Sequence, residues 1–332
     1  METALTGAAF GAALTAAGVY QPAVIVSQLR LENWHMIQAF LTAAAGSAIV
    51  VTAANVLGYV RLPPRSFSSL NLFARFDGNV IGGILLGTGM TLSGACPGTV
   101  LAQVALGIES GYYALAGAVV GGIVWTGLVL QPNLLPTPSS SLSKPQTRLS
   151  MYEQLGVSRG TMLVAFEAIC ASVVAATIYL TPPSTAKGGV HPVIGGLLIA
   201  GAQLLSILMR KSLMGTSTSY EEFGDWFWGL FSRGKMIGLP QRYNNMVFCS
   251  SMVGGAWLLS RFAPSLVAEI APLRIEPLAA GVGGCLMIIG SRLAGGCTSG
   301  HGISGISLLS TSSVLTIGVA FAWGAVVGLL MG

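Results

Sequence analysis

The sequence has 332 residues, of which 53% are hydrophobic and only 8% are charged, and its mean hydropathy is +0.74. A soluble domain carries about 25% charged residues, so this composition excludes a soluble protein. The net charge of +5 is spread between apolar segments without a basic stripe, which excludes a nucleic-acid-binding protein. We therefore predict an all-α polytopic membrane protein.

Nine apolar segments approach the roughly 20 residues that a membrane-spanning helix needs. They lie at about 3–20, 35–59, 79–93, 112–131, 161–180, 193–209, 243–260, 277–294 and 313–331. Residues 1–3 lack the basic region of a signal peptide, so we expect them to belong to the mature chain. Three apolar pieces, at 23–29, 99–108 and 303–310, are too short to cross and predict re-entrant half-helices.

The predicted helices divide into two related halves. A shift of 201 positions places seven residues of the first half on identical residues of the second half. The pairs are Gly82/Gly283, Gly83/Gly284, Leu85/Leu286, Gly89/Gly290, Leu92/Leu293, Gly94/Gly295 and Cys96/Cys297. Four spans in each half, with one span between them, predict two inverted repeats with pseudo-two-fold symmetry, a plan that recurs in transporters.

The whole chain, 1–332, is predicted to form a single membrane domain. Its expected parts are a first repeat at 1–131, a polar linker rich in Pro and Ser at 132–160, a connecting helix at 161–181 and a second repeat at 186–332. Trp226 and Trp228, in the polar stretch 221–242, are typical of interfacial anchors. Most loop Lys and Arg fall on the side of the N-terminus, which predicts a cytoplasmic N-terminus in the plasma (inner) membrane.

Two glycine- and cysteine-containing segments are the strongest candidates for a functional site. Leu92–Thr99 reads LSGACPGT and Leu293–Gly302 reads LAGGCTSGHG, and each follows a helix too short to cross. Glycine releases the backbone from the helix, and Pro97 lacks an N–H group. A short helix that starts near Thr99 or Ile303 would then begin inside the membrane and point free N–H groups at an anion. The alternative is that these residues only permit close helix packing.

The five cysteines form no C-x-x-C pair and no zinc spacing, so we expect neither a disulfide framework nor a metal site, and no cofactor. Cys170, Cys249 and Cys285 are interpreted as small buried hydrophobes. Cys96 and Cys297 lie at the breaks, where a thiol is a weak donor that suits a polarisable sulfur anion. Sulfate or phosphate would instead call for arginine and hydroxyl groups.

Further polar residues surround the breaks. His301 could lower the pKa of the Cys297 thiol, bind substrate or simply be a buried histidine, and Arg292 could attract anions or reach the interface. The predicted substrate-binding residues are Cys96, Cys297, Gly94, Pro97, Gly98, Thr99, Gly295, Gly296, Thr298, His301 and Arg292. The predicted pore-lining residues are Tyr20, Gln21, Thr216 and Ser217.

On these motifs the sequence resembles the YeeE/YedE sulfur-transport family. The likeness is carried by Gly82–Thr99 and Gly283–Gly302, and more weakly by Gly18–Gln28 and Arg210–Ser219. It implies a helical bundle with pseudo-two-fold symmetry and short non-spanning helices. It also implies uptake of thiosulfate, handed between Cys96 and Cys297 at a central constriction. The family pattern has a further functional cysteine in the first span region, which this chain lacks.

The leading hypothesis is a permease, not an enzyme, for thiosulfate or a related sulfur anion. The alternative is a membrane sulfurtransferase that forms a persulfide on Cys96 or Cys297 and needs an activating base. An intramembrane protease that uses Ser304 and His301 has less support, because no third orienting group is apparent. The expected partners are a small inorganic sulfur anion and the lipid bilayer, with a cytoplasmic sulfur-carrier or sulfurtransferase protein left open.

Overall fold

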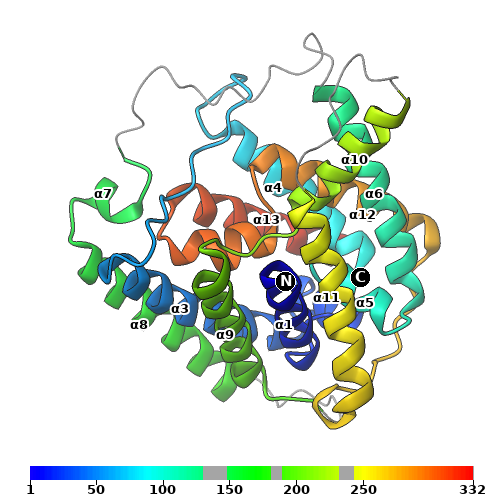
Figure 1. The fold of residues 1–332 in the computed structure, drawn as a ribbon, viewed down its shortest axis with the longest axis horizontal. Coiled ribbons are helices and arrows are strands. Elements are labelled where there is room, and N and C mark those ends of the chain that lie inside the picture. Colours follow the sequence, from blue (N-terminus) through cyan, green and yellow to red (C-terminus); the bar gives the residue numbers. More distant parts are fainter. Residues whose placement is uncertain (130–147, 181–188, 232–242, 332) are drawn as a thin grey trace.

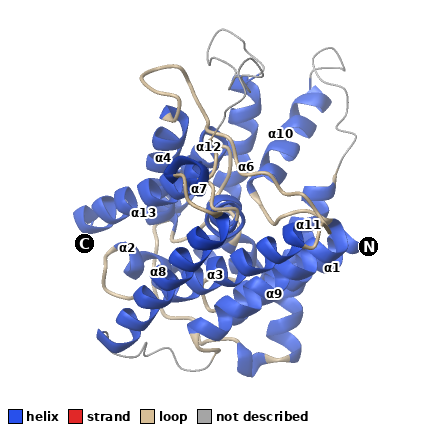
Figure 2. Cartoon of the chain, turned by 90° about the vertical axis from the view of Figure 1, so that its left-hand side faces the viewer, coloured by secondary structure: helices blue, strands red, loops and turns tan. Residues whose placement is uncertain are grey.

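The structure, a computed structural model, describes residues 1–129, 148–180, 189–231 and 243–331 (Figures 1 and 2). Their regular structure is helical, and within these ranges the only β pairing is an isolated bridge between Ser150 and Ser310. The helices are α1 (Glu2–Ala16), α2 (Pro22–Leu29), α3 (His35–Val56), α4 (Asp77–Ser93), α5 (Thr99–Ala105), α6 (Glu109–Val129), α7 (Met151–Leu155), α8 (Arg159–Leu180), α9 (Pro192–Arg210), α10 (Ser217–Phe231), α11 (Asn244–Phe262), η1 (Pro264–Leu266), α12 (Pro277–Ala294), η2 (Thr298–Gly305) and α13 (Thr311–Met331).

A helix occupies each of the nine predicted spans. Among the described residues six helices, α3, α6, α8, α9, α12 and α13, are long and apolar enough to cross a membrane. Of the other three, α1 has 15 residues and α4 has 17 residues. The third, α11, has 19 residues but includes polar residues such as Asn244 and Asn245. The prediction of an all-helical, polytopic membrane protein therefore agrees with the structure.

Two local predictions differ from the structure, and one polar stretch without a predicted helix is helical in part. The first part of the polar stretch 221–242 continues α10 as far as Phe231, while 232–242 lies outside the described residues. Of the predicted linker 132–160, the part 132–147 also lies outside them, and the remainder contains α7 and the start of α8. The second short helix begins at Thr298 rather than near Ile303, and it is a π-helix.

The contacts between helices come in matched pairs across the two halves of the chain. The helices α4 and α12 pack on each other at the centre, while α12 also packs on α6 and α4 packs on α13. In the same way α1 packs on α11, and α9 packs on α3. The short helix α5 contacts α6 and α11, and η2 contacts the corresponding α13 and α3. Each short helix therefore lies between two longer helices in the interior of the bundle.

Glycines bring α4 and α12 into direct backbone contact. A Cβ built on Gly82 would lie 2.5 Å from the carbonyl oxygen of Gly290, and one built on Gly290 would lie 2.6 Å from that of Gly82. The corresponding distances are 2.6 Å from Gly89 to Gly283 and 2.8 Å in the reverse direction. These four glycines belong to the pairs matched by the 201-residue shift. Small residues thus allow the two central helices to approach closely, which positions the two breaks that follow them.

Candidate functional site

The first break follows α4. Gly94 ends this helix in the left-handed conformation at φ +59°, which glycine adopts without strain. The chain then turns through Cys96 into α5. The Cys96 N–H donates to Thr99 Oγ1 at 2.8 Å, and the Thr99 N–H donates to Cys96 Sγ at 3.4 Å. Because the sulfur already accepts this bond, its own S–H is left to donate to another group.

The second break follows α12 and has a different shape. Gly295 ends the helix at φ +84° and is exposed, whereas Cys297, two residues later, is fully buried. The wide π-helix η2 then begins directly after Cys297, and the His301 N–H donates to the Cys297 carbonyl oxygen at 2.7 Å. This segment therefore leads from the surface to a buried thiol within three residues.

Thr216 joins the two breaks. It precedes α10, is fully buried, and its Oγ1 lies 3.4 Å from both Cys297 Sγ and Ser299 Oγ. On its other side, a Cβ built on Gly98 would lie 3.6 Å from the Thr216 methyl group and 3.7 Å from its hydroxyl. Tyr220, one turn further along α10, donates its hydroxyl to the Pro97 carbonyl oxygen at 2.9 Å. The structure thus brings the predicted residues of both motifs together.

A cavity of about 40 Å³ adjoins the first break. Cys96 and Thr99 of the first break and Thr298 and Ser299 of the second break contribute to its lining, but almost all of the surface that faces the cavity is apolar. The Thr298 side chain is buried, and its hydroxyl has no hydrogen-bond partner among the described residues. A buried hydroxyl without a partner costs free energy, so Thr298 contributes an unsatisfied polar group next to a cavity whose surface is apolar. The apolar lining residues are Phe10, Leu14, Val19, Met36, Phe40, Ala43, Ile199 and Ile303.

Both ring nitrogens of His301 already have hydrogen-bond partners. Its Nδ1 lies 2.8 Å from Ser313 Oγ and its Nε2 lies 3.0 Å from the Ala294 carbonyl oxygen. A carbonyl can only accept, so Nε2 carries the proton and Nδ1 accepts from the serine hydroxyl. Ser304 donates its hydroxyl to Met214 O at 2.6 Å. The two side chains considered for a protease are therefore each bonded to other groups.

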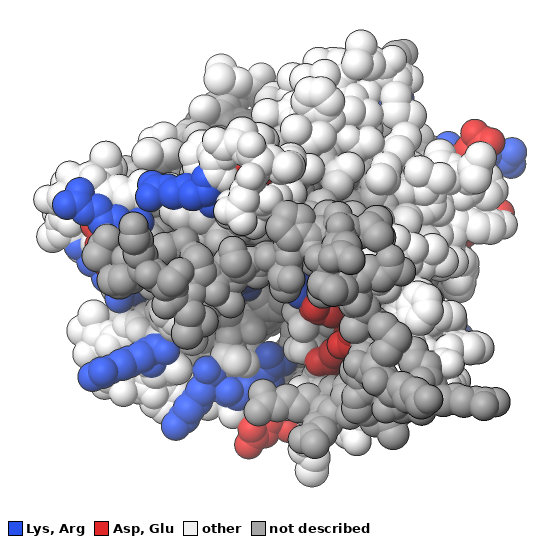
Figure 3. All heavy atoms as spheres, turned by 90° about the horizontal axis from the view of Figure 1, so that it is seen from above, with Lys and Arg blue, Asp and Glu red and all other residues white. Residues whose placement is uncertain are grey.

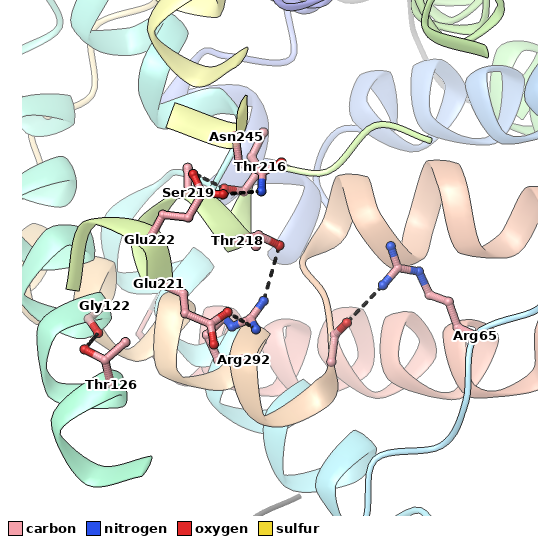
Figure 4. A network of polar contacts seen from close by, with 11 residues as sticks. Arg65, Gly122, Thr126, Thr216, Thr218, Ser219, Glu221, Glu222, Asn245 and Arg292 are labelled. Carbon is pink, nitrogen blue, oxygen red and sulfur yellow. Dashed lines mark hydrogen bonds and ion pairs between the residues drawn. The ribbon is translucent and has the colours of Figure 1, made fainter. Parts of the chain in front are cut away.

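Two arginines approach the second break from opposite sides (Figure 4). Arg292, on α12, forms an ion pair with Glu221 of α10 and donates to Thr218 Oγ1 at 3.4 Å. Arg65, on the loop between α3 and α4, donates from Nη1 to the Gly295 carbonyl oxygen at 2.9 Å. The charge of Arg292 is thus balanced by a carboxylate. Arg292 was predicted from the sequence as a candidate anion-binding residue, and Arg65 was not.

Of the four residues predicted to line the pore, Thr216 and Ser217 lie at the meeting point of the breaks, whereas Tyr20 and Gln21 do not. Ser217 begins α10 and is buried next to Thr216. The Tyr20 hydroxyl instead donates to Ala268 O at 3.0 Å, and Gln21 Oε1 accepts from the Ala271 N–H at 3.2 Å. These two side chains fasten the break after α1 to the loop before α12, and the neighbouring Val19 lines the cavity.

Sequence reasoning missed three residues of this region. Ser299 Oγ lies 3.2 Å from Cys297 Sγ, and it could have been found because it belongs to the second motif. Cys249, interpreted as a small hydrophobe, donates from Sγ to Ser219 Oγ at 3.1 Å. It lies on α11, and no motif of the sequence marks it. Arg65 likewise lies in a loop without a motif, and only the fold brings it to the break.

The loop that carries Arg65 is fixed at its C-terminal end by Asp77. The Asp77 carboxylate accepts hydrogen bonds from the N–H groups of Leu70, Leu72, Phe73 and Gly78. Removal from water raises the pKa of this carboxyl, but the four donors outweigh that effect and lower the pKa to about 2. Figure 3 shows the face that lies at the top of Figure 1. On this face most of the visible Lys and Arg side chains lie on the side of α7 and α8.

Comparison of the sequence with known proteins identifies its family. The model of the sulphur transport family matches residues 16–327, which is nearly the whole chain. The chain belongs to the sulphur transport family. Over 253 residues it is 25% identical to the thiosulfate transporter TsuA of Spirochaeta thermophila, a match that covers 72% of each chain. Over 146 residues it is 29% identical to a probable transporter of Xylella fastidiosa strain Temecula1, a match that covers 43% of this chain and 94% of that protein.

These comparisons and the helical structure agree with the prediction from the sequence motifs. Membership of the sulphur transport family, together with the six helices among the described residues that are long and apolar enough to span a membrane, identifies the chain as a membrane transporter of sulfur compounds.

Proposed function

We propose that this member of the sulphur transport family is a permease for thiosulfate or a closely related sulfur anion. The observation that carries the proposal is the meeting of two broken helices at Thr216, with Cys297 on one side and the Cys96 cavity on the other. The anion passes between these thiols, which replace part of its hydration shell. A thiol is a weak donor, so it releases the anion again, as a conduction path requires.

The proposed architecture has nine membrane spans, with α2, α5, α10 and η2 as the non-spanning pieces. The two repeats would be inverted and related by a pseudo-two-fold axis near the α4–α12 contact. The matched helix contacts and the reciprocal approaches of Gly82 to Gly290 and of Gly89 to Gly283 support this proposal. In the plasma membrane, the N-terminus and the loop that carries Arg65 would face the cytoplasm.

The proposed site consists of the two thiols with Gly94, Pro97, Gly98 and Thr99 at the first break and Gly295, Gly296, Thr298, Ser299 and Thr216 at the second. Passage is favoured over sulfur transfer because a persulfide-forming thiol needs a base to activate it. Both ring nitrogens of His301 are bonded elsewhere, to Ser313 and Ala294. We therefore assign His301 the role of holding the second break in shape. The ion pair gives Arg292 a similar structural role.

Uptake of labelled thiosulfate into proteoliposomes tests the proposal. We expect uptake by the native chain, little inhibition by sulfate, and loss of uptake in Cys96→Ala and Cys297→Ala. Cys285→Ala is the matched control, because this half-buried cysteine on α12 lies outside both breaks. Serine at positions 96 and 297 keeps a small donor, so partial uptake by these variants supports passage. Complete loss with a persulfide trapped on the native protein would instead support sulfur transfer, and a folded native chain without uptake would refute the substrate.

A further inference from the structure

The loop between α3 and α4 delivers one side chain into the second break. The backbone of Arg65 is fixed there, because its carbonyl oxygen accepts hydrogen bonds from the hydroxyls of Ser310 and Ser312, each at 3.0 Å. From this position the side chain extends to the end of α12, where Nη1 donates to Gly295 O (Figure 4). The guanidinium is thus held at the exposed side of the break, close to the buried thiol.

Two glycines of the second motif make room for this guanidinium. A Cβ built on Gly296 would lie 3.0 Å from Arg65 Nη1, which is closer than most real contacts. A Cβ built on Gly300 would lie 3.4 Å from Arg65 Nη2 and 3.7 Å from Cys297 Sγ. The guanidinium and the thiol therefore both lie within 3.7 Å of the position that a Cβ at residue 300 would occupy, and Gly300 leaves this position open.

The charge of Arg65 is not balanced by a carboxylate of the described residues, where the one ion pair joins Arg292 to Glu221. The Nε of Arg65 is buried and has no hydrogen-bond partner within the same part of the chain. A partly buried cation with unused donors attracts an anion, and a guanidinium in particular matches the oxygens of an oxoanion. A thiol next to it provides a softer, polarisable contact.

We propose that Arg65 is a specificity-determining residue that binds the oxygen end of the anion, while Cys297 contacts its terminal sulfur across the space at Gly300. This inference rests on the proposed function and defines its substrate class: small sulfur oxoanions that carry both a charged oxygen face and an exposed sulfur. Sulfate has the first feature only and hydrosulfide the second only. An anion with both features makes contacts with both groups at once.

The competing explanation is that Arg65 only clamps its loop to Gly295. Two variants separate these roles. Arg65→Gln removes the charge and the clamp together, whereas Gly300→Ala fills the shared space and leaves the bond from Arg65 to Gly295 in place. The added methyl group makes ordinary van der Waals contacts at 3.4 and 3.7 Å, so this variant is expected to fold. Arg61→Gln is the matched control, since Arg61 is an exposed arginine of the same loop.

The experiment measures the initial rate of labelled thiosulfate uptake against concentration in proteoliposomes. Loss of a charge-assisted hydrogen bond predicts that Arg65→Gln raises KM by about tenfold or more. Arg65→Lys keeps the charge, so its KM is expected to lie between that of the native chain and that of Arg65→Gln. Gly300→Ala raises KM, and Arg61→Gln leaves it unchanged. If Arg65→Gln lowers only the maximal rate and Gly300→Ala keeps the native KM, Arg65 is a clamp and the inference is overturned.

A second measurement separates this inference from the proposed function. Absence of uptake by the folded native chain, relative to protein-free vesicles, refutes the proposed function. Binding is then followed as the rise in Tm that thiosulfate produces in detergent. A rise in the native chain and in Arg61→Gln that is lost in Arg65→Gln supports the anion site. Equal shifts in all three proteins, or no shift in any of them, overturn it.

Discussion

Replacement of Thr216 by valine removes one hydroxyl from the point where the two breaks meet. The two side chains have nearly the same shape, so the change deletes the contacts from Oγ1 to Cys297 Sγ and Ser299 Oγ, each 3.4 Å long, and little else. Ser299, at 3.2 Å, then remains as the hydroxyl next to the thiol. Transport is therefore expected to weaken while the fold persists.

The size of the effect follows from the nature of this contact. A neutral hydrogen bond contributes about 1 kcal/mol. If the hydroxyl helps to orient the thiol towards the anion, KM rises by about fivefold, since about 1.4 kcal/mol corresponds to tenfold. The free energy of unfolding falls by a similar amount, and for a chain of this size Tm falls by about 2–4 °C or less.

Uptake kinetics and thermal unfolding are measured on the same preparations. The matched control is Thr126→Val, because Thr126 is also buried and donates within α6 to Gly122 O at 3.1 Å, away from both breaks (Figure 4). The control is expected to show a comparable change in Tm with a native KM. Native KM and native maximal rate in Thr216→Val would refute the argument that this hydroxyl belongs to the transport path.

The remaining predictions concern the framework of the site. Gly290→Ala forces α4 and α12 apart and is expected to lower the yield of folded protein in size-exclusion chromatography. The control is Gly318→Ala, where a Cβ meets nothing within 4 Å, and this variant is expected to raise Tm. Equal yields of the two variants would contradict the backbone contact. Tyr220→Phe removes the bond to Pro97 O and should cost about 1 kcal/mol in unfolding free energy with reduced uptake; unchanged Tm and uptake would contradict this role. Asp77→Asn lowers Tm at pH 7. Because the folded pKa of Asp77 is about 2, its contribution to native stability is full above about pH 4 and is lost as the pH falls towards 2. A mutant with native Tm at pH 7 would refute the proposed loop anchor.

The sequence predicted the parts of the structure that depend on local composition and on the repeat. The positions of nine helices follow from apolar segments, and Gly94 and Gly295 end α4 and α12 as their motifs predict. Membership of the sulphur transport family was also evident from these motifs. In each case the information lies in neighbouring residues, so it can be recognised without knowledge of the fold.

The features that the sequence did not predict depend on distant contacts or on an unusual local form. The helix α10 was missed because Glu221, Glu222 and Asp225 lower its hydropathy, although they lie on a helix whose other side packs against α6. Arg65 was missed because its target, Gly295, is 230 residues away. The start of η2 was misplaced because Gly300, Gly302 and Gly305 disfavour an ordinary α-helix, while the chain forms a π-helix there.

The close approach of α4 to α12 restricts how this protein can move. Where two backbones touch at Gly82 and Gly290, and again at Gly89 and Gly283, no flexible side chains lie between them to absorb a sliding or rocking motion. A large rigid-body displacement of one half against the other would have to break both contacts together. We therefore expect the motion that accompanies each transport event to leave the α4–α12 contact intact and to involve the break segments and their side chains. Transport without large domain movement would leave the outer helices with the same lipid contacts throughout the cycle.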